Sequence, residues 1–261
     1  MPATELTFNT LPSSFLILTK TLFKTSTPAM AILPLCAVAQ PATENTLQWL
    51  HDHEKTQLAR FSFEKRYCEW LGGRICAKQS LRIFLSNSTQ HTDFIPEHTQ
   101  CCTQSEESGR PFFSPMNGSD FNFPELSISH SKEYAAALTS STACGIDIQF
   151  SAQNLLRVQE KFCTAEESQI LQQELPGLSP LSHLTLIWSA KEAVKKTLSS
   201  GGIPGFQELQ LCKLEPQNSD DFILYFSSTK TKHTMQVSAT MTKDNYAIAI
   251  CCAAASQTGF A

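Results

Sequence analysis

The order of helix-like and strand-like segments constrains the fold of this chain more than any other sequence feature. Apolar side chains recur at helical spacing between residues 45 and 81, and residues 125–150 then alternate in three short strand-like runs. The order returns, because residues 154–198 are helical in pattern and four strand-like runs follow between residues 206 and 253. Helices followed by strands, twice, favour an α+β protein made of two packed halves.

This pattern divides the chain into three parts. Residues 1–28 are rich in Ser and Thr and show no clear period, which predicts a loose extension. The apolar run "AILPLCAVAQ" then predicts a buried first strand, which opens an N-terminal α+β half over residues 29–142. A C-terminal α+β half is expected over residues 143–261, and no internal sequence repeat is visible between the halves.

Composition and charge exclude several classes of protein. Hydrophobic residues make up 41% and charged residues 17% of the chain, which favours a packed globular fold. A net charge of −4 provides no basic field for nucleic acid. Lys20 and Lys24 interrupt the apolar N-terminal residues, so neither a membrane span nor a signal peptide is expected. We therefore expect a cytoplasmic protein with no nucleic acid or membrane partner.

The ten cysteines favour the same compartment. Cys101–Cys102 and Cys251–Cys252 are adjacent pairs, and no C-x-x-C motif occurs. This spacing is unlike a disulfide-stapled secreted scaffold and predicts reduced, mostly buried thiols. Zinc is the alternative, but His98 with the first pair, or His51 with His53, makes a poor tetrahedral set of ligands.

Two acidic residues of the C-terminal half are candidates for chemistry. In "GIDIQ", Ile146 and Ile148 face one side of a strand, and Asp147 and Gln149 face the other. Taken alone, Asp147 is an ordinary solvated strand residue.

The second acid lies in "WSAKEAVKK", residues 188–196. Trp188, Glu192 and Lys196 form one row at i, i+4 spacing on a helix, with Lys191 and Lys195 beside it. Taken alone, this row is a surface Glu–Lys pair that stabilises the helix by about 0.2–0.5 kcal/mol.

His130, at the end of the strand-like run "SISHS", is a third candidate. A Ser-His-Asp triad of Ser129, His130 and Asp147 is a weak alternative, because adjacent strand residues point to opposite faces and no G-x-S-x-G motif is present. Two acids, a lysine and a histidine are instead suited to hold a divalent metal and a pyrophosphate. Mg²⁺ prefers one or two carboxylates together with phosphate oxygens and water.

Six segments form an ordered set of motifs: "KRYCEWLGGRICAK" (65–78), "GRP" (109–111), "SISHS" (127–131), "GIDIQ" (145–149), "FCTAEE" (162–167) and "WSAKEAVKK" (188–196). This set resembles the surfactin-type (Sfp-type) 4′-phosphopantetheinyl transferases and spans roughly residues 61–196. The last motif and the order of the set are specific, whereas "GRP" alone is weak.

The resemblance implies a fold of two similar α+β halves related by a pseudo-twofold axis, with coenzyme A and Mg²⁺ between them. It also implies a reaction of the holo-[acyl-carrier-protein] synthase type. A serine hydroxyl of an apo acyl or peptidyl carrier protein attacks the β-phosphate of coenzyme A, the 4′-phosphopantetheine arm moves to that serine, and 3′,5′-ADP leaves. A monomer is plausible for such an internal pseudo-dimer, and the carrier can belong to fatty-acid biosynthesis, polyketide or peptide synthesis.

The resemblance further implies roles for single residues. Asp147 and Glu192 coordinate Mg²⁺, and Glu192 deprotonates the carrier serine directly or through water. Lys196 contacts phosphate and completes the catalytic set. The other residues expected to contact coenzyme A are His130, Ser129, Arg110, Lys191, Arg66 and Arg74. Residues 162–167 are expected to shape the side on which the carrier docks, and Glu166 can equally be an acid at a helix N-terminus.

One position departs from the family pattern, because Gln149 stands where the strand motif usually ends in Glu. An amide is a poorer Mg²⁺ ligand than a carboxylate, so we expect two protein carboxylates at the metal, with Gln149 beside them. The departure leaves open a non-catalytic module that binds coenzyme A or a carrier. A different Mg²⁺-dependent phosphotransferase is a further alternative, although no P-loop motif is present.

Overall fold

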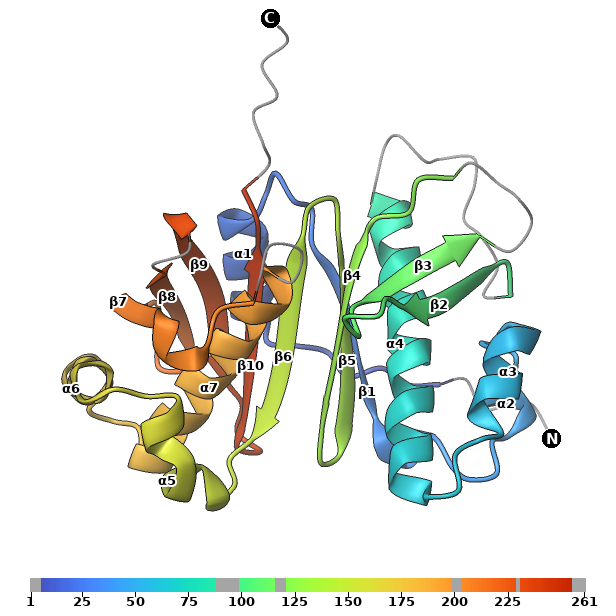
Figure 1. Ribbon diagram of the computed structural model, residues 1–261, viewed down its shortest axis with the longest axis horizontal. Coiled ribbons are helices and arrows are strands. Elements are labelled where there is room, and N and C mark those ends of the chain that lie inside the picture. Colours follow the sequence, from blue (N-terminus) through green and yellow to red (C-terminus); the bar gives the residue numbers. More distant parts are fainter. Residues whose placement is uncertain (1–5, 88–98, 116–120, 199–202, 229–230, 255–261) are drawn as a thin grey trace, which may run out of the picture.

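The computed structural model describes residues 6–87, 99–115, 121–198, 203–228 and 231–254 of the 261-residue chain. Helices and strands mix in an α+β arrangement, as predicted (Figure 1). The first series of elements is α1 (Ser13–Leu22), β1 (Ala29–Pro34), α2 (Glu44–Leu47), α3 (Asp52–Leu58), α4 (Glu64–Asn87), β2 (Cys101–Ser105), β3 (Pro111–Pro115), β4 (Glu125–Ser131) and β5 (Tyr134–Ser140). The second is β6 (Cys144–Phe150), α5 (Asn154–Val158), α6 (Ala165–Glu174), α7 (Pro180–Thr197), β7 (Leu209–Pro216), β8 (Asp221–Ser228), β9 (Thr231–Met241) and β10 (Tyr246–Cys252).

After α1, and leaving out 3₁₀ turns, the same order of elements occurs twice. Among the described residues, one strand, three helices and four strands run from β1 to β5, and again from β6 to β10. The first and last strands of each series are antiparallel neighbours, since β1 pairs with β5 and β6 pairs with β10. The sheets have the orders β1-β5-β4, β2-β3 and β6-β10-β9-β8-β7. The domain limits and the pseudo-twofold axis stay predictions.

The long helix α4 covers the sheet β1-β5-β4, which we call the N-terminal sheet. The five-stranded sheet β6-β10-β9-β8-β7 is the C-terminal sheet. Leu71 and Ile75, at helical spacing, are buried in one core with Ala135 of β5. Gly72 allows a close approach, because a Cβ at this position would lie 2.7 Å from Cδ2 of Leu35. The middle of this helix therefore packs closely against its neighbours.

The helix α7 covers the C-terminal sheet in the same way. It begins with a hydroxyl cap, because the side chain of Ser179 accepts the backbone N–H of Ser182 at 3.1 Å, and Pro180 follows the cap. The four strands predicted after this helix are β7 to β10. A turn at residues 243–245 joins β9 and β10 as antiparallel neighbours, and Asn245 there has a φ of 62°, which asparagine tolerates.

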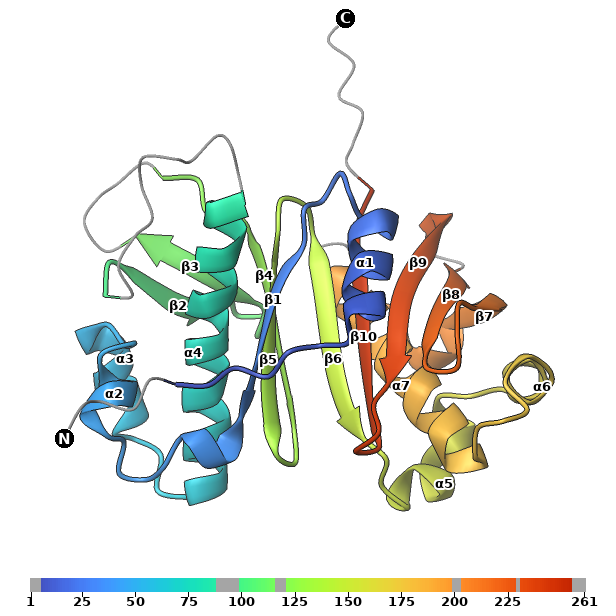
Figure 2. The ribbon, with the colours of Figure 1, turned by 180° about the vertical axis from the view of Figure 1, so that it is seen from behind.

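The loose extension predicted for residues 1–28 is wrong over residues 13–22, which form α1. Phe15 and Phe23 are buried in a core with strands of both sheets, and the hydroxyls of Thr19 and Ser238 lie 2.9 Å apart. Figures 1 and 2 show α1 on the side of the C-terminal sheet opposite to α7. The strand predicted in "AILPLCAVAQ" is confirmed only up to Pro34, where β1 ends and a 3₁₀ turn (Leu35–Ala37) follows. The segment before β1 folds because these two phenylalanines bury.

Residues 86–110 are polar and loop-like in sequence, and a loop predicted there from composition is partly wrong. Residues 88–98 lie outside the described residues, but residues 101–105 form β2, which pairs with β3. Cys101 and Cys102 of β2 are buried and behave as the small hydrophobic residues expected from their spacing.

The two halves meet where β4 lies beside β6 (Figures 1 and 2). These strands belong to different sheets and are joined through side chains. The bonds run from backbone N–H to hydroxyl oxygen, as Ile146 to Ser127 at 3.1 Å, Ile148 to Ser129 at 3.3 Å and Phe150 to Ser131 at 2.9 Å. We call these three bonds the serine ladder. Residue numbers rise together along it, so β4 and β6 run parallel.

No helix among the described residues is both long and apolar enough to cross a membrane.

Candidate active site

The helix α7 can lie directly on β6 because Gly145 has no side chain. A Cβ at Gly145 would lie 2.0 Å from the carbonyl oxygen of Ala193. The hydroxyl of Ser189 on α7 donates to the backbone carbonyl of Asp147 at 3.2 Å. The strand and the helix predicted to carry the two acids therefore pack face to face, and β6 is the strand of the C-terminal sheet that lies beside β4 (Figure 1).

Asp147 is 6% exposed, and its two carboxylate oxygens have different surroundings. Oδ1 accepts hydrogen bonds from the Ser129 hydroxyl and the Lys196 ammonium, each at 2.8 Å. Oδ2 is buried and has no hydrogen-bond partner among the described residues. A buried carboxylate oxygen without a protein donor is a position where a cation fits.

Lys196 of α7 donates hydrogen bonds to two neighbouring residues of β6, one of which is Asp147. Its Nζ also donates to the backbone carbonyl of Ile146 at 2.8 Å. Among the described residues, this carbonyl and Asp147 Oδ1 are its only acceptors, and the side chain is 26% exposed. Since an ammonium group has three N–H bonds, one remains for a phosphate oxygen.

Glu192 lies one helical turn before Lys196 and is half-buried. Burial raises the pKa of its carboxyl group above the ordinary value; Lys196 opposes this rise, and Asp147 adds to it. The three predicted catalytic residues, Asp147, Glu192 and Lys196, are therefore close enough for their charges to act on one another. A carboxylate whose pKa is raised accepts a proton more readily, which suits a general base.

The structure argues against the phosphate contact predicted for Lys191. Its side chain is fully buried and its ammonium donates to Glu167 Oε2 and to the carbonyl oxygens of Phe162 and Phe206, at 2.8, 2.8 and 3.0 Å. All three N–H bonds are used inside the protein, so Lys191 holds the fold together. Burial lowers its pKa, and Glu167 opposes that shift.

His130 faces α4, and its Nδ1 lies 3.5 Å from Oε1 of Glu69. Glu69 is buried and accepts a hydrogen bond from Arg66 at 3.4 Å. Two residues predicted to contact phosphate, His130 and Arg66, therefore lie against the same carboxylate. Burial lowers the pKa of His130; Glu69 opposes this shift, and Asp147 and Lys196 also act on the same imidazole. His130 therefore lies near Asp147 and Lys196. It does not form a triad with Ser129, because the Ser129 hydroxyl donates to Asp147.

The other two arginines lie away from this group. Arg110 pairs with Glu125 at the start of β4, and His130 comes roughly 17 Å further along that strand, at a rise of about 3.3 Å per residue. Arg74 stacks on the Trp70 ring, with 4.5 Å from its guanidinium carbon to the ring centroid. The structure does not bring Arg110 or Arg74 to Asp147, so neither is supported as a phosphate contact there.

Gln149 lies on the same face of β6 as Asp147. Its side-chain amide donates to the carbonyl oxygen of Phe150 at 2.9 Å. Among the described residues, no three His, Cys, Asp or Glu side chains come together in a way that could hold a metal ion. The predicted metal set of Asp147, Glu192 and Gln149 contains two carboxylates and stays a prediction.

The cysteines give no zinc site among the described residues, and all ten are free thiols. Cys102 Sγ does lie 3.7 Å from His53 Nδ1, but burial raises the pKa of this thiol to about 11. A structural zinc site needs four ligands, and this pair supplies two. His98 lies outside the described residues.

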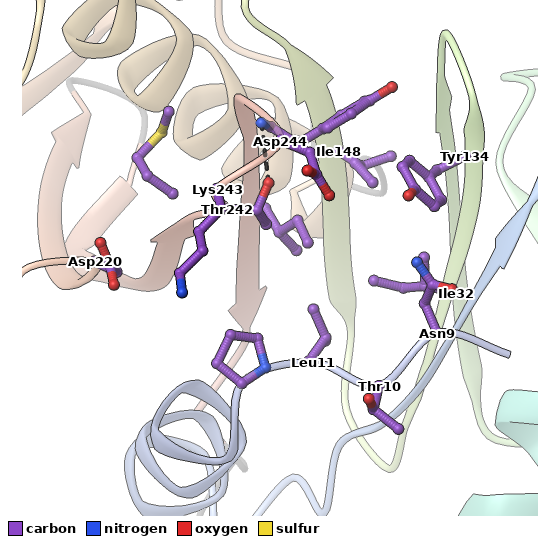
Figure 3. Close-up of a pocket in the computed structure, with 14 residues that line it drawn as sticks. Asn9, Thr10, Leu11, Ile32, Tyr134, Ile148, Asp220, Thr242, Lys243 and Asp244 are labelled. Atoms are coloured by element: carbon purple, nitrogen blue, oxygen red, sulfur yellow. Dashed lines mark hydrogen bonds between the residues drawn. The ribbon is translucent and has the colours of Figure 1, made fainter.

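A cavity of about 400 Å³ lies on the opposite side of β6 from Asp147 (Figure 3). Ile148 of β6 lines it, together with Tyr134 of β5, Ile32 of β1 and Leu11 from the segment before α1. Side chains alternate along a strand, so Ile148 and Asp147 face opposite sides. None of the predicted site residues lines this cavity, which is separate from the candidate active site.

Two acidic partners of residues predicted for the site were missed in the sequence. Glu69 stands three residues after Arg66, a helical spacing that signals an ion pair. Glu167 closes a capping box with Thr164, whose backbone N–H it accepts at 2.9 Å, and the T-x-x-E spacing is the signature of this motif. Glu166 is exposed in the first turn of α6, as expected for an acid at a helix N-terminus.

Comparison with known proteins adds an independent finding. A search of curated proteins found no match. The family model of the 4′-phosphopantetheinyl transferase superfamily matches residues 143–251, which is a little under half of the chain. The match extends from the start of β6 into β10 and so includes Asp147, Glu192 and Lys196. Over residues 143–251, the chain is therefore similar to the 4′-phosphopantetheinyl transferase superfamily.

Proposed function

We propose that this protein transfers the 4′-phosphopantetheine arm of coenzyme A to a serine of an apo acyl or peptidyl carrier protein. The products are holo-carrier and 3′,5′-ADP. The proposal includes the finer expectations from the sequence, namely an Sfp-type enzyme of the holo-[acyl-carrier-protein] synthase kind that acts as a cytoplasmic monomer. The match of the superfamily model to residues 143–251 supports the transfer in general.

The contact between Asp147 and Lys196 carries the proposal. These residues lie 49 positions apart in the sequence, yet their side chains meet at 2.8 Å, with Glu192 one helical turn away. A surface helix with a routine Glu–Lys pair would not bury an aspartate beneath that lysine. An acid pair with a lysine between two α+β halves suits a phosphate substrate.

The residues around Asp147 fit a divalent cation. Oδ2 of Asp147 is buried without a donor, Glu192 supplies a second carboxylate, and both are hard oxygen ligands of the kind that Mg²⁺ prefers. Gln149 would stand beside them as an outer contact. When bound, Mg²⁺ would offset the negative charge that develops on the pyrophosphate oxygens.

The chain's own residues would then act as follows. Glu192 accepts the proton of the carrier serine as its hydroxyl oxygen forms a bond to the β-phosphorus of coenzyme A. The bond from that phosphorus to the bridging oxygen breaks, and 3′,5′-ADP leaves with the electron pair. Lys196 donates its remaining N–H to the pyrophosphate, while His130 and Arg66 contact coenzyme A phosphate from the N-terminal half.

The test is to mix the protein with coenzyme A, Mg²⁺ and several apo-carriers in parallel and to measure carrier mass. A gain of one phosphopantetheine arm supports the proposal and identifies the carrier class. Glu192→Gln serves as the inactive control.

The non-catalytic module remains the alternative, because the Gln149 side chain carries no charge and its amide nitrogen donates to the Phe150 carbonyl. Tight binding of coenzyme A or carrier, without a mass gain on any carrier, would favour this module. Turnover of a nucleotide in the absence of a carrier would favour a different phosphotransferase.

A further inference from the structure

Ser129 differs from the other two serines of the serine ladder. All three hydroxyls accept a backbone N–H from β6, at 2.9–3.3 Å. Only Ser129 also donates to the Asp147 carboxylate, at 2.8 Å, among the bonds of the described residues. One hydroxyl therefore links the N-terminal half, the β6 backbone and the proposed metal ligand.

The hydrogen bonds that the Ser129 hydroxyl already makes restrict which further groups it can bind. A serine has a single O–H to donate, and here that hydrogen lies between Oγ and Asp147 Oδ1. The side chain is buried, 6% exposed, and one of its lone pairs already accepts the N–H of Ile148. Ser129 cannot donate to a coenzyme A phosphate while it holds Asp147, which conflicts with the direct contact expected from the sequence.

Lys196 makes the Ser129 bond more important. Both groups donate to the same oxygen, Oδ1, and leave Oδ2 without a protein donor. Once Lys196 shares its charge with a phosphate, Ser129 becomes the fixed donor that keeps the carboxylate in this orientation. A hydrogen bond of this kind to a ligating carboxylate commonly sets metal affinity.

We infer that Ser129 is a positioning residue, which orients the Asp147 carboxylate for the metal and ties that carboxylate to the N-terminal half. The inference rests on the proposed function and replaces a direct contact of the Ser129 side chain with coenzyme A.

The serine ladder supplies its own matched controls. Ser127→Ala and Ser131→Ala each remove one ladder bond without touching Asp147, whereas Ser129→Ala removes a ladder bond together with the carboxylate contact. Ser129→Thr keeps the hydroxyl. The readout is binding of Mn²⁺, followed by electron paramagnetic resonance, to the full-length protein with coenzyme A and no carrier. A second readout is the Michaelis constant for coenzyme A in the carrier assay.

Ser129→Ala should weaken Mn²⁺ binding by about 10–100-fold, the usual effect of removing such a partner. Ser127→Ala and Ser131→Ala should bind Mn²⁺ as wild type does, and Ser129→Thr should recover most of the affinity. The Michaelis constant for coenzyme A should change little in Ser129→Ala. Should the alanine variant not fold, Ser129→Cys keeps the volume with a far weaker donor and should show the same loss.

Two results would overturn the inference. Equal weakening of Mn²⁺ binding in all three alanine variants would mean that the ladder as a whole matters, and not the contact to Asp147. A raised Michaelis constant for coenzyme A with unchanged Mn²⁺ affinity would restore the direct contact. Neither result touches the proposed transfer. Conversely, a wild-type protein that binds Mn²⁺ and coenzyme A but modifies no carrier would reject the transfer alone.

Discussion

Two buried lysine–glutamate pairs occupy corresponding places in the two halves. In the N-terminal half, Lys78 of α4 pairs with Glu54, which accepts the backbone N–H of Thr103 on β2 at 2.9 Å. In the C-terminal half, Lys191 of α7 pairs with Glu167, which accepts the N–H of Leu211 on β7 at 2.8 Å. Each glutamate also closes a capping box at the start of its own short helix.

The residues around the two pairs differ. Lys191 is followed by Glu192, and Lys196 lies five positions later; at the same offsets from Lys78 stand Gln79 and Ile83. The strand under α4 buries Ala29, Ala31 and Leu33 in the helix-facing core. The strand under α7 presents Gly145, Asp147 and Gln149 instead. One framework is thus filled with apolar side chains in one half and with acids and a lysine in the other.

This difference separates framework from site. A buried lysine paired with a buried glutamate recurs in both halves, so it belongs to the framework. The carboxylate and the lysine that follow it occur in one half only, so they belong to the site. The four predictions below test this separation.

Glu192→Gln should have the largest effect, because the amide cannot take the carrier serine's proton and is a poor metal ligand. We expect transfer to fall by about 10²–10⁴-fold with the fold unchanged, measured as carrier mass gain with time. Gln79→Ala, at the corresponding place on α4, should leave transfer near wild type. Undiminished transfer by Glu192→Gln would reject the mechanism.

Lys191→Met and Lys78→Met should each destabilise the protein by about 3–5 kcal/mol, since each leaves a buried glutamate without its cation. Urea unfolding followed by circular dichroism measures this cost. Similar costs would support a common framework role. If Lys191→Met instead kept full stability but lost affinity for coenzyme A, the phosphate contact predicted from the sequence would be right after all.

Gly145→Ala and Gly72→Ala compare the two close approaches of helix and sheet. At Gly145 the new Cβ meets the backbone oxygen of Ala193 at 2.0 Å, so α7 must shift; we expect a loss of about 1–3 kcal/mol and slower transfer. At Gly72 the clash is with the end of a leucine side chain, and alanine favours the helix by about 1 kcal/mol, so the net change in unfolding free energy should be smaller.

Gly177→Ala is the control for both glycine variants, because a Cβ at Gly177 meets no atom within 4 Å. Equal stability of the Gly145 and Gly177 variants would contradict the close packing of α7 on β6.

The smallest expected effect is the pH dependence of folding stability that arises from His130. Burial lowers its folded pKa below the ordinary 6.5, against the opposing charge of Glu69. The unfolded chain then binds more protons near pH 6.5, so the contribution of His130 to stability is complete above that pH and is lost as the pH falls toward the folded pKa. Charges on Glu69, Arg66, Lys196 and Asp147 all act on this imidazole.

Nuclear magnetic resonance of the imidazole can follow the titration directly. The pKa of His130 should lie below 6.5 in the free protein and should fall further in Glu69→Gln. Coenzyme A should raise it if the ring contacts phosphate. A pKa that coenzyme A leaves unchanged would remove His130 from the proposed binding residues.

Local patterns in the sequence were sufficient for much of the fold. The helix at 188–196 and the strands around Asp147 have strong periodicity, and both were predicted correctly. The helix α1 was missed because its Ser and Thr residues hide the period, and its burial depends on strands more than 200 positions away, as for Thr19 and Ser238. Short β2 was missed because "CCTQS" reads as a polar loop.

The candidate site was harder to derive from the sequence. A motif fixes which residues are present but not which lysine is buried, and the acceptors of Lys191 come from segments 15–29 positions away. The arginine positions likewise depend on tertiary packing, so Arg110 and Arg74 could be named but not placed. Contacts between β4, β6 and α7 decide the roles, and no local rule encodes them.

The serine ladder has one more consequence, for solubility. The backbone N–H groups of β6 that face β4 would form an exposed sheet edge if the halves separated, and such edges recruit strands from other chains. Hydroxyl groups saturate these donors without offering a new row of backbone groups to extend. The seam between the halves thus closes one edge of each sheet, at β4 and at β6, against intermolecular strand addition while the chain stays folded.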